Sequence, residues 1–251
     1  MNVLLVTGGS RGIGANIARR AAERGWHVCV NYTSNEDRAQ EVASDVRSQG
    51  VKAAVVQADV SVPGEVEAMF DRTEQELGPI TGLVNNAGVA TTVRGPIEEL
   101  DIDSTRRMLD VNVFGVFVCC RCAVKRMSKR YGGQGGVIVN ISSSAARSAS
   151  PGRWVDYAAG KAAVDTLTIG LAKEPGPHGI RVFGVRPGFI KTDMAATGAN
   201  PSLLERAIAG TPLGRIGEVD DVSNAVIWML SEEARHSTGT IIDVSGGRWT
   251  Q

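Results

Sequence analysis

Short apolar segments alternate with amphipathic segments along almost the whole chain. The apolar segments lack strict polar–apolar alternation, which predicts strands buried on both faces of a sheet. They cover residues 3–7, 28–30, 53–56, 83–84, 137–141, 180–185 and 241–244. The amphipathic segments between them predict helices over residues 12–25, 35–49, 63–77, 103–130, 154–173 and 218–230. Strands alternating with helices indicate an α/β fold, a doubly wound parallel sheet of about seven strands with helices on both faces.

The chain reads as one domain over residues 1–251, because no Pro/Gly/Ser-rich linker, internal repeat or low-complexity tract divides it. Residues 189–215 have no clear period. Long irregular segments in compact domains are usually functional, so we expect a flexible substrate lid there.

Composition narrows the class of protein. Hydrophobic residues make up 43% of the chain, and 27 basic residues balance 27 acidic ones, so we expect no nucleic-acid partner. No apolar run is long enough to span a bilayer, and no export signal precedes the first strand, so we expect no membrane partner. Two of the four cysteines form a CxxC (Cys119 and Cys122), but nothing completes a metal set. Buried free thiols, no metal and a reducing, cytoplasmic location are expected.

The unusual polar and glycine-rich runs all follow predicted strands. They are the glycines after strand one, Asp59 after strand three, Asn85–Gly88 after strand four, Ser142–Ser144 after strand five, and Pro187-Gly188 after strand six. In a doubly wound sheet of the Rossmann type, ligands bind at the carboxyl ends of the strands. We therefore expect one composite site at that edge.

The first glycine run, Gly8 to Gly14, lies between a strand and a helix. Glycines let the backbone approach a pyrophosphate, and the amino end of the following helix favours negative charge. Farther along, Tyr157 and Lys161 are neighbours on one helix face. An ammonium beside a phenol lowers the tyrosine pKa, which suits proton exchange with a substrate oxygen.

Two rival motifs fit poorly. The run from Gly8 to Gly12 formally matches GxSxG, the hydrolase nucleophile elbow around Ser10. A hydrolase also needs a histidine base, and the histidines that follow, His178 and His236, are in no run that ends at the site edge. A P-loop is excluded because GxxxxGK[ST] does not occur.

These residues resemble the short-chain dehydrogenase/reductase family over essentially the whole chain, in the right order. Thr7–Gly14 matches the TGxxxGxG run and Asn85–Gly88 matches NNAG. Asn112 matches the helix asparagine of the family. Ser143 matches its serine, and Tyr157 with Lys161 matches YxxxK. Pro187 and Gly188 match the PG motif, and Thr192 matches its threonine. The chain is similar to the branch with 3-oxoacyl-carrier-protein reductases, glucose 1-dehydrogenase-like enzymes and carbonyl reductases. Gly160 departs from the pattern, since serine often precedes the lysine.

The resemblance implies the catalytic roles. Tyr157 would be the general acid in carbonyl reduction, and Lys161 would lower its pKa and bind the nicotinamide ribose. Ser143 would hydrogen-bond the substrate oxygen, with Ser144 as the alternative, and Asn112 would hold a water for proton resupply. Asp59 would accept from the adenine amino group, and Val60 would offer its backbone. The full set expected to bind the cofactor is Gly8, Ser10, Arg11, Gly12, Ile13, Gly14, Asn31, Tyr32, Thr33, Ser34, Asp59, Val60, Asn86, Ala87, Gly88, Tyr157, Lys161, Pro187, Gly188, Ile190 and Thr192.

The end of strand two bears on the choice of cofactor. NAD sites place a carboxylate there for the ribose 2′-hydroxyl. Here the segment reads Asn31-Tyr32-Thr33-Ser34, with no carboxylate before Glu36, and Arg11 offers a cation for a 2′-phosphate. NADP is therefore expected in preference to NAD.

The substrate stays open. An oxidoreductase acting on a carbonyl or alcohol is expected, with a 3-oxoacyl thioester reductase, a sugar dehydrogenase and a non-catalytic NADP sensor as alternatives. Lys129, Arg130 and Lys173 could dock an acidic acyl carrier protein. The resemblance implies a homotetramer built partly from the helices at 103–130 and 154–173. The sequence supports it with apolar residues on several helix faces: Phe114, Phe117, Val118, Val164, Leu167 and Leu171.

Overall fold

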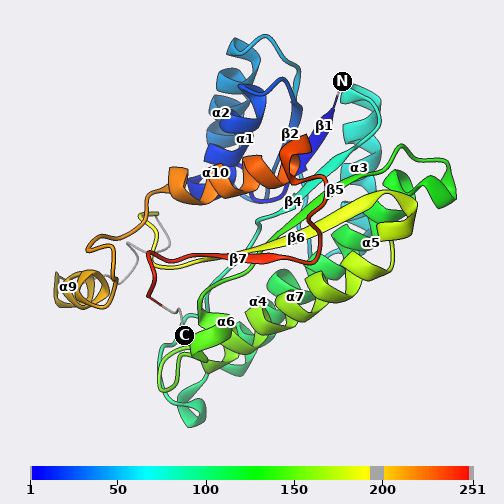
Figure 1. The fold of residues 1–251 in the computed structure, drawn as a ribbon. Coiled ribbons are helices and arrows are strands. Elements are labelled where there is room, and N and C mark those ends of the chain that lie inside the picture. Colours follow the sequence, from blue (N-terminus) through cyan, green and yellow to red (C-terminus); the bar gives the residue numbers. More distant parts are fainter. Residues whose placement is uncertain (1, 193–200, 249–251) are drawn as a thin grey trace.

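A single parallel sheet of seven strands organises the computed structural model, which describes residues 2–192 and 201–248 (Figure 1). The strand order is β3-β2-β1-β4-β5-β6-β7. The strands are β1 (Val3–Val6), β2 (His27–Tyr32), β3 (Ala53–Gln57), β4 (Gly82–Asn85), β5 (Gly136–Ile141), β6 (Ile180–Pro187) and β7 (Ile241–Val244). The predicted doubly wound α/β fold is confirmed.

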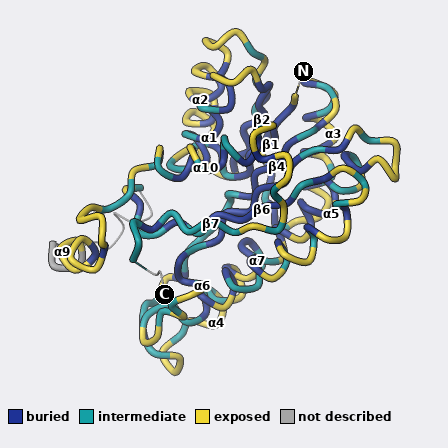
Figure 2. Tube along the Cα trace, in the orientation of Figure 1, coloured by how far each residue is buried: buried dark blue, intermediate teal, exposed yellow. Residues whose placement is uncertain are grey.

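Two apolar layers cover the two faces of the sheet. One contains buried residues of α1 (Gly12–Ala22), α2 (Glu36–Ser48) and α10 (Val219–Leu230). The other contains buried residues of α3 (Pro63–Leu77), α5 (Gly115–Met127) and α7 (Val155–Lys173). The central strands are buried along their length (Figure 2), which explains their lack of polar alternation.

The helix predicted over residues 103–130 is instead three consecutive elements. It consists of α4 (Ile102–Leu109), a π-helical turn over Asp110–Phe114, and α5. Asn112 lies in the π turn, where its side chain both donates to and accepts from the backbone of Val89, each at 2.8 Å. A contact across 23 residues of sequence sets this irregularity, so the local period did not show it.

Residues 189–215 are less irregular than expected, because α9 (Pro201–Ala209) lies within them. Residues 193–200 of the expected lid lie outside the described residues. The remaining short helices are η1 (Ile97–Glu99), η3 (Lys129–Tyr131), α6 (Ala145–Ser148), η4 (Gly176–His178) and η5 (Glu232–Ala234).

Only part of the expected surface apolar set is exposed. Phe114 and Phe117 are 47% and 49% exposed. The other four face the core: Val118 and Val164 are buried, and Leu167 and Leu171 pack against the core. Leu109 and Ile169, which the sequence analysis did not single out, are exposed on α4 and α7.

Candidate active site

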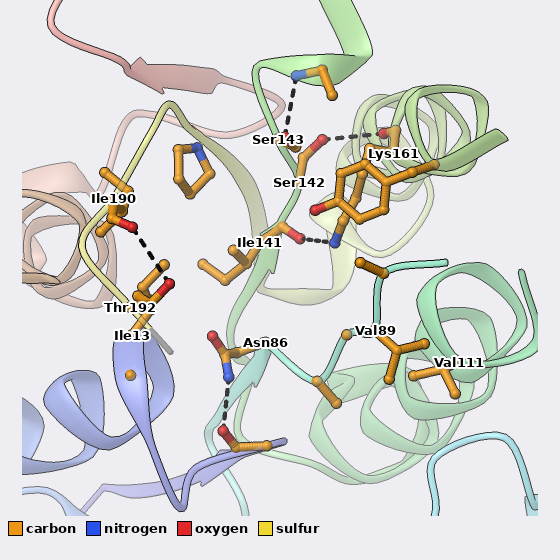
Figure 3. A pocket seen from close by; sticks show the side chains of 18 of the residues that line it. Ile13, Asn86, Val89, Val111, Ile141, Ser142, Ser143, Lys161, Ile190 and Thr192 are labelled. Atoms are coloured by element: carbon orange, nitrogen blue, oxygen red, sulfur yellow. Dashed lines mark hydrogen bonds between the residues drawn. The ribbon is translucent and has the colours of Figure 1, made fainter. Parts of the chain in front are cut away.

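A cavity of about 670 Å³ opens at the carboxyl edge of the sheet, where the polar runs were expected to meet (Figure 3). Most of the residues expected to bind a cofactor line it. They are Gly8, Ser10, Arg11, Gly12, Ile13, Tyr32, Thr33, Ser34, Asp59, Val60, Asn86, Ala87, Gly88, Tyr157, Lys161, Pro187, Gly188, Ile190 and Thr192. Gly14, Asn31 and Asn112 do not line it.

The glycine loop is locked to the loop after β4. The Asn86 amide donates to the carbonyl oxygens of Thr7 and Gly8 at 3.0 and 2.9 Å. A Cβ atom at Gly14 would lie only 2.4 Å from Asn86 Nδ2. Gly14, expected at the cofactor, thus allows this close approach and does not line the cavity.

The beginning of α1 fits a pyrophosphate. Gly12 has a φ of +55° at the cavity wall, where other residues would be strained. Arg11 is the N-cap of α1, and its side chain makes no capping hydrogen bond. The first backbone N–H groups of α1 thus face the cavity side without a side-chain cap, as an anion site at a helix amino end requires.

Asn31 supports the loop from behind. It is buried; its Oδ1 accepts from the Gly8 backbone at 3.0 Å, and its amide donates to the carbonyl oxygens of Tyr32, Val56 and Ala58. The Asn31 side chain, expected at the cofactor, is thus committed to the backbone and does not line the cavity. Successive strand residues point to opposite sides, and Tyr32 is the one that lines the cavity.

A second cation, which sequence reasoning missed, lies at the end of β2. Arg38 lines the cavity with Thr33 and Ser34. It is in the first turn of α2, where the Asn35 side chain caps its backbone N–H at 3.0 Å. The signal available in the sequence was an arginine three residues after a helix-capping asparagine. Glu36 does not line the cavity.

Asp59 also lines the cavity, and both oxygens of its carboxylate already accept hydrogen bonds. One oxygen accepts from Arg107 at 2.5 Å, and the other accepts from the Ser61 hydroxyl at 2.7 Å. Burial acts to raise the pKa of Asp59, but the hydrogen bonds from Ser61 and Arg107 outweigh it and lower the pKa. Arg107, also missed from the sequence, lines the cavity here.

The tyrosine and the lysine meet at the other end. Lys161 Nζ donates to the carbonyl oxygen of Ile141 at 2.8 Å and lies 5.8 Å from the centre of the Tyr157 ring. Ser142 donates to the backbone carbonyl of Lys161, which ties β5 to α7. Ser143 is the serine whose hydroxyl reaches Tyr157. Ser144 is buried, and its backbone donates to Pro187.

Burial dominates the ionisation of this pair. It raises the pKa of Tyr157, and the hydrogen bond with Ser143 offsets only part of the rise. Burial also lowers the pKa of Lys161 to about 8, against the opposing effect of Asp165. The expected lowering of the Tyr157 pKa by Lys161 is not found; the effect that opposes burial is the hydrogen bond with Ser143.

The loop after β6 closes the cavity on the remaining side. The Gly188 backbone packs so closely that a Cβ atom there would lie 2.8 Å from the Ser245 backbone. Thr192 donates to the carbonyl oxygen of Ile190 at 3.4 Å and lies next to Gly12, where a Cβ atom would be 3.6 Å from its methyl group.

Comparison with known proteins decides the family. A family model described as "Enoyl-(Acyl carrier protein) reductase" matches residues 8–248. The chain belongs to the short-chain dehydrogenase/reductase family. It is 48% identical to the uncharacterized oxidoreductase YgfF of Escherichia coli, over 99% of this chain and 100% of that protein.

Two further members of the family bear on its chemistry. The 3-oxoacyl-[acyl-carrier-protein] reductase FabG of Staphylococcus aureus is 36% identical over 98% of this chain and 97% of its own length. The crystal structure of a short chain dehydrogenase from Burkholderia cenocepacia in complex with NADP has a TM-score of 0.90. It is 36% identical and covers 98% of this chain and 97% of its own. This chain is thus an NAD(P)-dependent oxidoreductase of the family.

The hydrolase alternative also fails on geometry. His27 begins β2, His178 lies just before β6, and His236 lies before β7. All three are at the amino edge of the sheet, away from Ser10. Within residues 2–192 and 201–248, no group of three or more His, Cys, Asp or Glu side chains could hold a metal ion. No helix in that part of the chain is long and apolar enough to cross a membrane.

Proposed function

We propose that this protein is an NADP(H)-dependent carbonyl reductase, with Tyr157 as the general acid. The observation that carries the proposal is the convergence of Ser143, Tyr157 and Lys161 at one end of a cavity whose other end fits a dinucleotide. When bound, the reduced nicotinamide supplies the hydride for the carbonyl carbon. Tyr157 gives its phenolic proton to the carbonyl oxygen, so the product is a secondary or primary alcohol.

The neighbouring groups prepare Tyr157 for that step. Its raised pKa keeps the phenol protonated near neutral pH, as an acid must be before it donates. The Ser143 hydroxyl can donate to the same substrate oxygen as negative charge develops on it. Lys161, charged below about pH 8, stabilises the phenolate left behind and binds the ribose hydroxyls. The Asn112 side chain is committed to Val89, so its part in proton resupply is to hold the loop beside Lys161.

A preference for NADP is supported by the charges at the end of β2. Arg11, Arg38, Thr33 and Ser34 line that part of the cavity. The carboxylate of Asp59 also lines the cavity, but it is already paired with Arg107. The Burkholderia relative was solved with NADP, which agrees with this preference.

The substrate of this chain has several candidates among those used by the family. A 3-oxoacyl thioester is one candidate, because FabG is a relative. The basic residues expected to dock a carrier protein, however, lie near the amino ends of β5 and β6: Lys129 and Arg130 in η3, and Lys173 at the end of α7. They therefore give no support for delivery into this chain's own cavity. A sugar dehydrogenase and an NADP sensor remain the alternatives.

We further propose a homotetramer in a reducing, cytoplasmic location. The half-exposed Phe114 and Phe117, with Leu109 and Ile169, give the α4–α5–α7 surface an apolar face suited to a subunit contact. The four cysteines are free and buried, as in proteins of reducing compartments. A lid over residues 189–192 and 201–215 would include α9.

The test is NADPH oxidation with a panel of aldehydes, ketones, acyl thioesters and sugars. We expect turnover of at least one class of carbonyl substrate. We expect no ester hydrolysis, either by the wild type or by Ser10→Ala. Tight NADP binding without turnover across the panel would favour the sensor. Cofactor-independent ester hydrolysis that disappears in Ser10→Ala would favour the hydrolase.

A further inference from the structure

Cationic side chains gather around Trp154 at the tyrosine end of the cavity. The guanidinium carbon of Arg94 lies 4.6 Å from the centre of the Trp154 ring, and that of Arg153 lies 4.8 Å from it. The Trp154 ring is itself 6.0 Å from the ring of Tyr157. Arg153 and Trp154 line the cavity, as does Arg248, whose Nη1 donates to the carbonyl oxygen of Ala207 at 2.6 Å and whose other guanidinium nitrogens are the ones that could meet a ligand. Arg94, Arg153, Trp154 and Arg248 do not belong to the cofactor-binding or catalytic set.

The positive charge of Arg153 is costly in this place unless an anion shares it. The chain has no net charge, so four arginines in one place do not follow from an overall basic composition. Burial lowers the pKa of Arg153, and repulsion by Arg94, Arg206 and Arg248 lowers it further. Within the described part of the chain, no carboxylate forms an ion pair with Arg153. Buried or partly buried charges are normally paired.

The wall next to the arginines offers further donors. Trp154 Nε1 is buried and has no hydrogen-bond partner among the described residues. Ser148 and Ser150 line the same part of the cavity, with their hydroxyls 3.3 Å apart. Ser150 has a φ of +43° and Ala149 a φ of +55°, so this loop holds a left-handed backbone without glycine. Non-glycine residues in that region cluster at ligand sites.

We propose that the substrate carries an anionic group, a carboxylate or a phosphate, which binds to Arg153 and Arg248 while its carbonyl reacts at Tyr157. The proposal rests on the carbonyl reductase function and names its substrate class. Guanidinium groups recognise both anions through paired hydrogen bonds. Arg153 and Tyr157 both lie beside the Trp154 ring, so an anionic group at Arg153 and a carbonyl at Tyr157 can belong to one substrate. The chain length between the two groups is what the series of oxo carboxylates measures.

The experiment compares acids with their neutral analogues. Oxo carboxylates of increasing chain length and their methyl esters are assayed with NADPH, and dihydroxyacetone phosphate is compared with dihydroxyacetone. For one class of anion, we expect kcat/KM to be at least about tenfold higher than for its neutral analogue. The difference should come mainly from a lower KM for the anion. Arg153→Gln and Arg248→Gln should remove that difference by raising KM for the anion alone, and Arg153→Lys should restore part of it. Arg235→Gln, an exposed arginine at the amino edge of the sheet, is the matched control and should change neither.

A binding measurement separates this inference from the proposed function. Calorimetric titration with saturated carboxylates, which cannot react, is performed in the presence of NADP⁺. Binding that is weakened at least about tenfold by Arg153→Gln supports the anion site even if no carbonyl is reduced. Equal turnover of acids and esters, with no carboxylate or phosphate binding to a folded wild type, overturns the inference and leaves the reductase function standing. Equal loss of acid and ester turnover in Arg153→Gln, with normal circular dichroism, also overturns it.

Discussion

The Lys161 ammonium donates a hydrogen bond to the carbonyl oxygen of Ile141 at 2.8 Å, inside the protein and beside the ring of Tyr157. Ile141 ends β5, so this hydrogen bond connects the last residue of a central strand with the middle of α7. A second hydrogen bond joins the same two elements, because the Ser142 hydroxyl donates to the backbone carbonyl of Lys161. The strand end and the helix thus hold Ser143 and Tyr157 at a fixed separation, which a hydrogen bond between them requires.

Tyr157→Phe should reduce kcat by a factor of at least roughly 10². The change removes the transferable proton and keeps the ring that packs against Trp154. NADPH affinity, measured by fluorescence titration, should barely change, because the phenol is only one of many cavity-lining groups. A variant with near-normal kcat would remove Tyr157 from the mechanism.

The buried Lys161 predicts a specific dependence of stability on pH. Its pKa is about 8 in the folded protein against the ordinary value of 10.5, so between these values the unfolded chain holds a proton that the folded chain has released. Raising the pH through this window therefore stabilises the fold, by up to about 3 kcal/mol. Below pH 8 both states are protonated, and the buried charge carries its full cost.

Urea unfolding of the wild type and of Lys161→Met at a series of pH values measures this effect. The wild type should gain stability relative to Lys161→Met as the pH rises from 8 to 10.5. Loss of the hydrogen bond to Ile141 shifts the difference by a constant, so the slope is the test. Lys173→Met, at the exposed end of the same helix, should show no such slope. A flat difference for Lys161→Met would mean that Lys161 keeps an ordinary pKa.

Asn31 and Tyr32 should respond in opposite ways to replacement by aspartate. The Asn31 amide faces three backbone carbonyls, so Asn31→Asp places a buried charge against acceptors and should cost about 3 kcal/mol of unfolding free energy or more. Tyr32 is buried too, but it lines the cavity, so Tyr32→Asp should cost less stability than Asn31→Asp and should shift cofactor preference towards NAD. Thermal unfolding and cofactor titration of both variants decide this. A stable Asn31→Asp that binds NAD would return Asn31 to the cofactor site.

The sequence predicted the layers of this fold better than its exceptions. All seven strands follow from apolar runs, because strands buried on both faces need no long-range information. The π turn at Asn112 depends on Val89, and the side to which Asn31 points depends on its backbone partners, so local pattern could reveal neither. Arg38 and Arg153 became visible only when helix and loop positions placed them at the cavity wall.

The apolar surface around α5 should mediate assembly. Light scattering of the wild type at micromolar concentration should give a tetramer, and Phe117→Glu should give smaller species, because a charge in an apolar contact is left unpaired. The circular dichroism of the variant should be unchanged, since Phe117 is 49% exposed in the single chain. Tyr131→Glu, at a 61% exposed aromatic near the amino edge of the sheet, serves as the control and should stay tetrameric. A monomeric wild type would rule the assembly out.

Cofactor preference should depend on Arg11 and Arg38 together. Both line the cavity at the end of β2, with the hydroxyls of Thr33 and Ser34 between two helix amino ends. A 2′-phosphate would meet cations and hydroxyl donors there, whereas the 2′-hydroxyl of NAD would find no carboxylate to accept its proton. Charge-assisted hydrogen bonds contribute about 1.5–3 kcal/mol, so NADP should bind roughly ten- to a hundredfold more tightly than NAD.

Calorimetric titration of both cofactors should show that Arg11→Ala and Arg38→Ala each weaken NADP binding alone and that the double variant removes most of the preference. Arg24→Ala, at an exposed residue in the turn just after α1, should change neither affinity. Equal or tighter binding of NAD by the wild type would mean that neither arginine meets a phosphate in the complex.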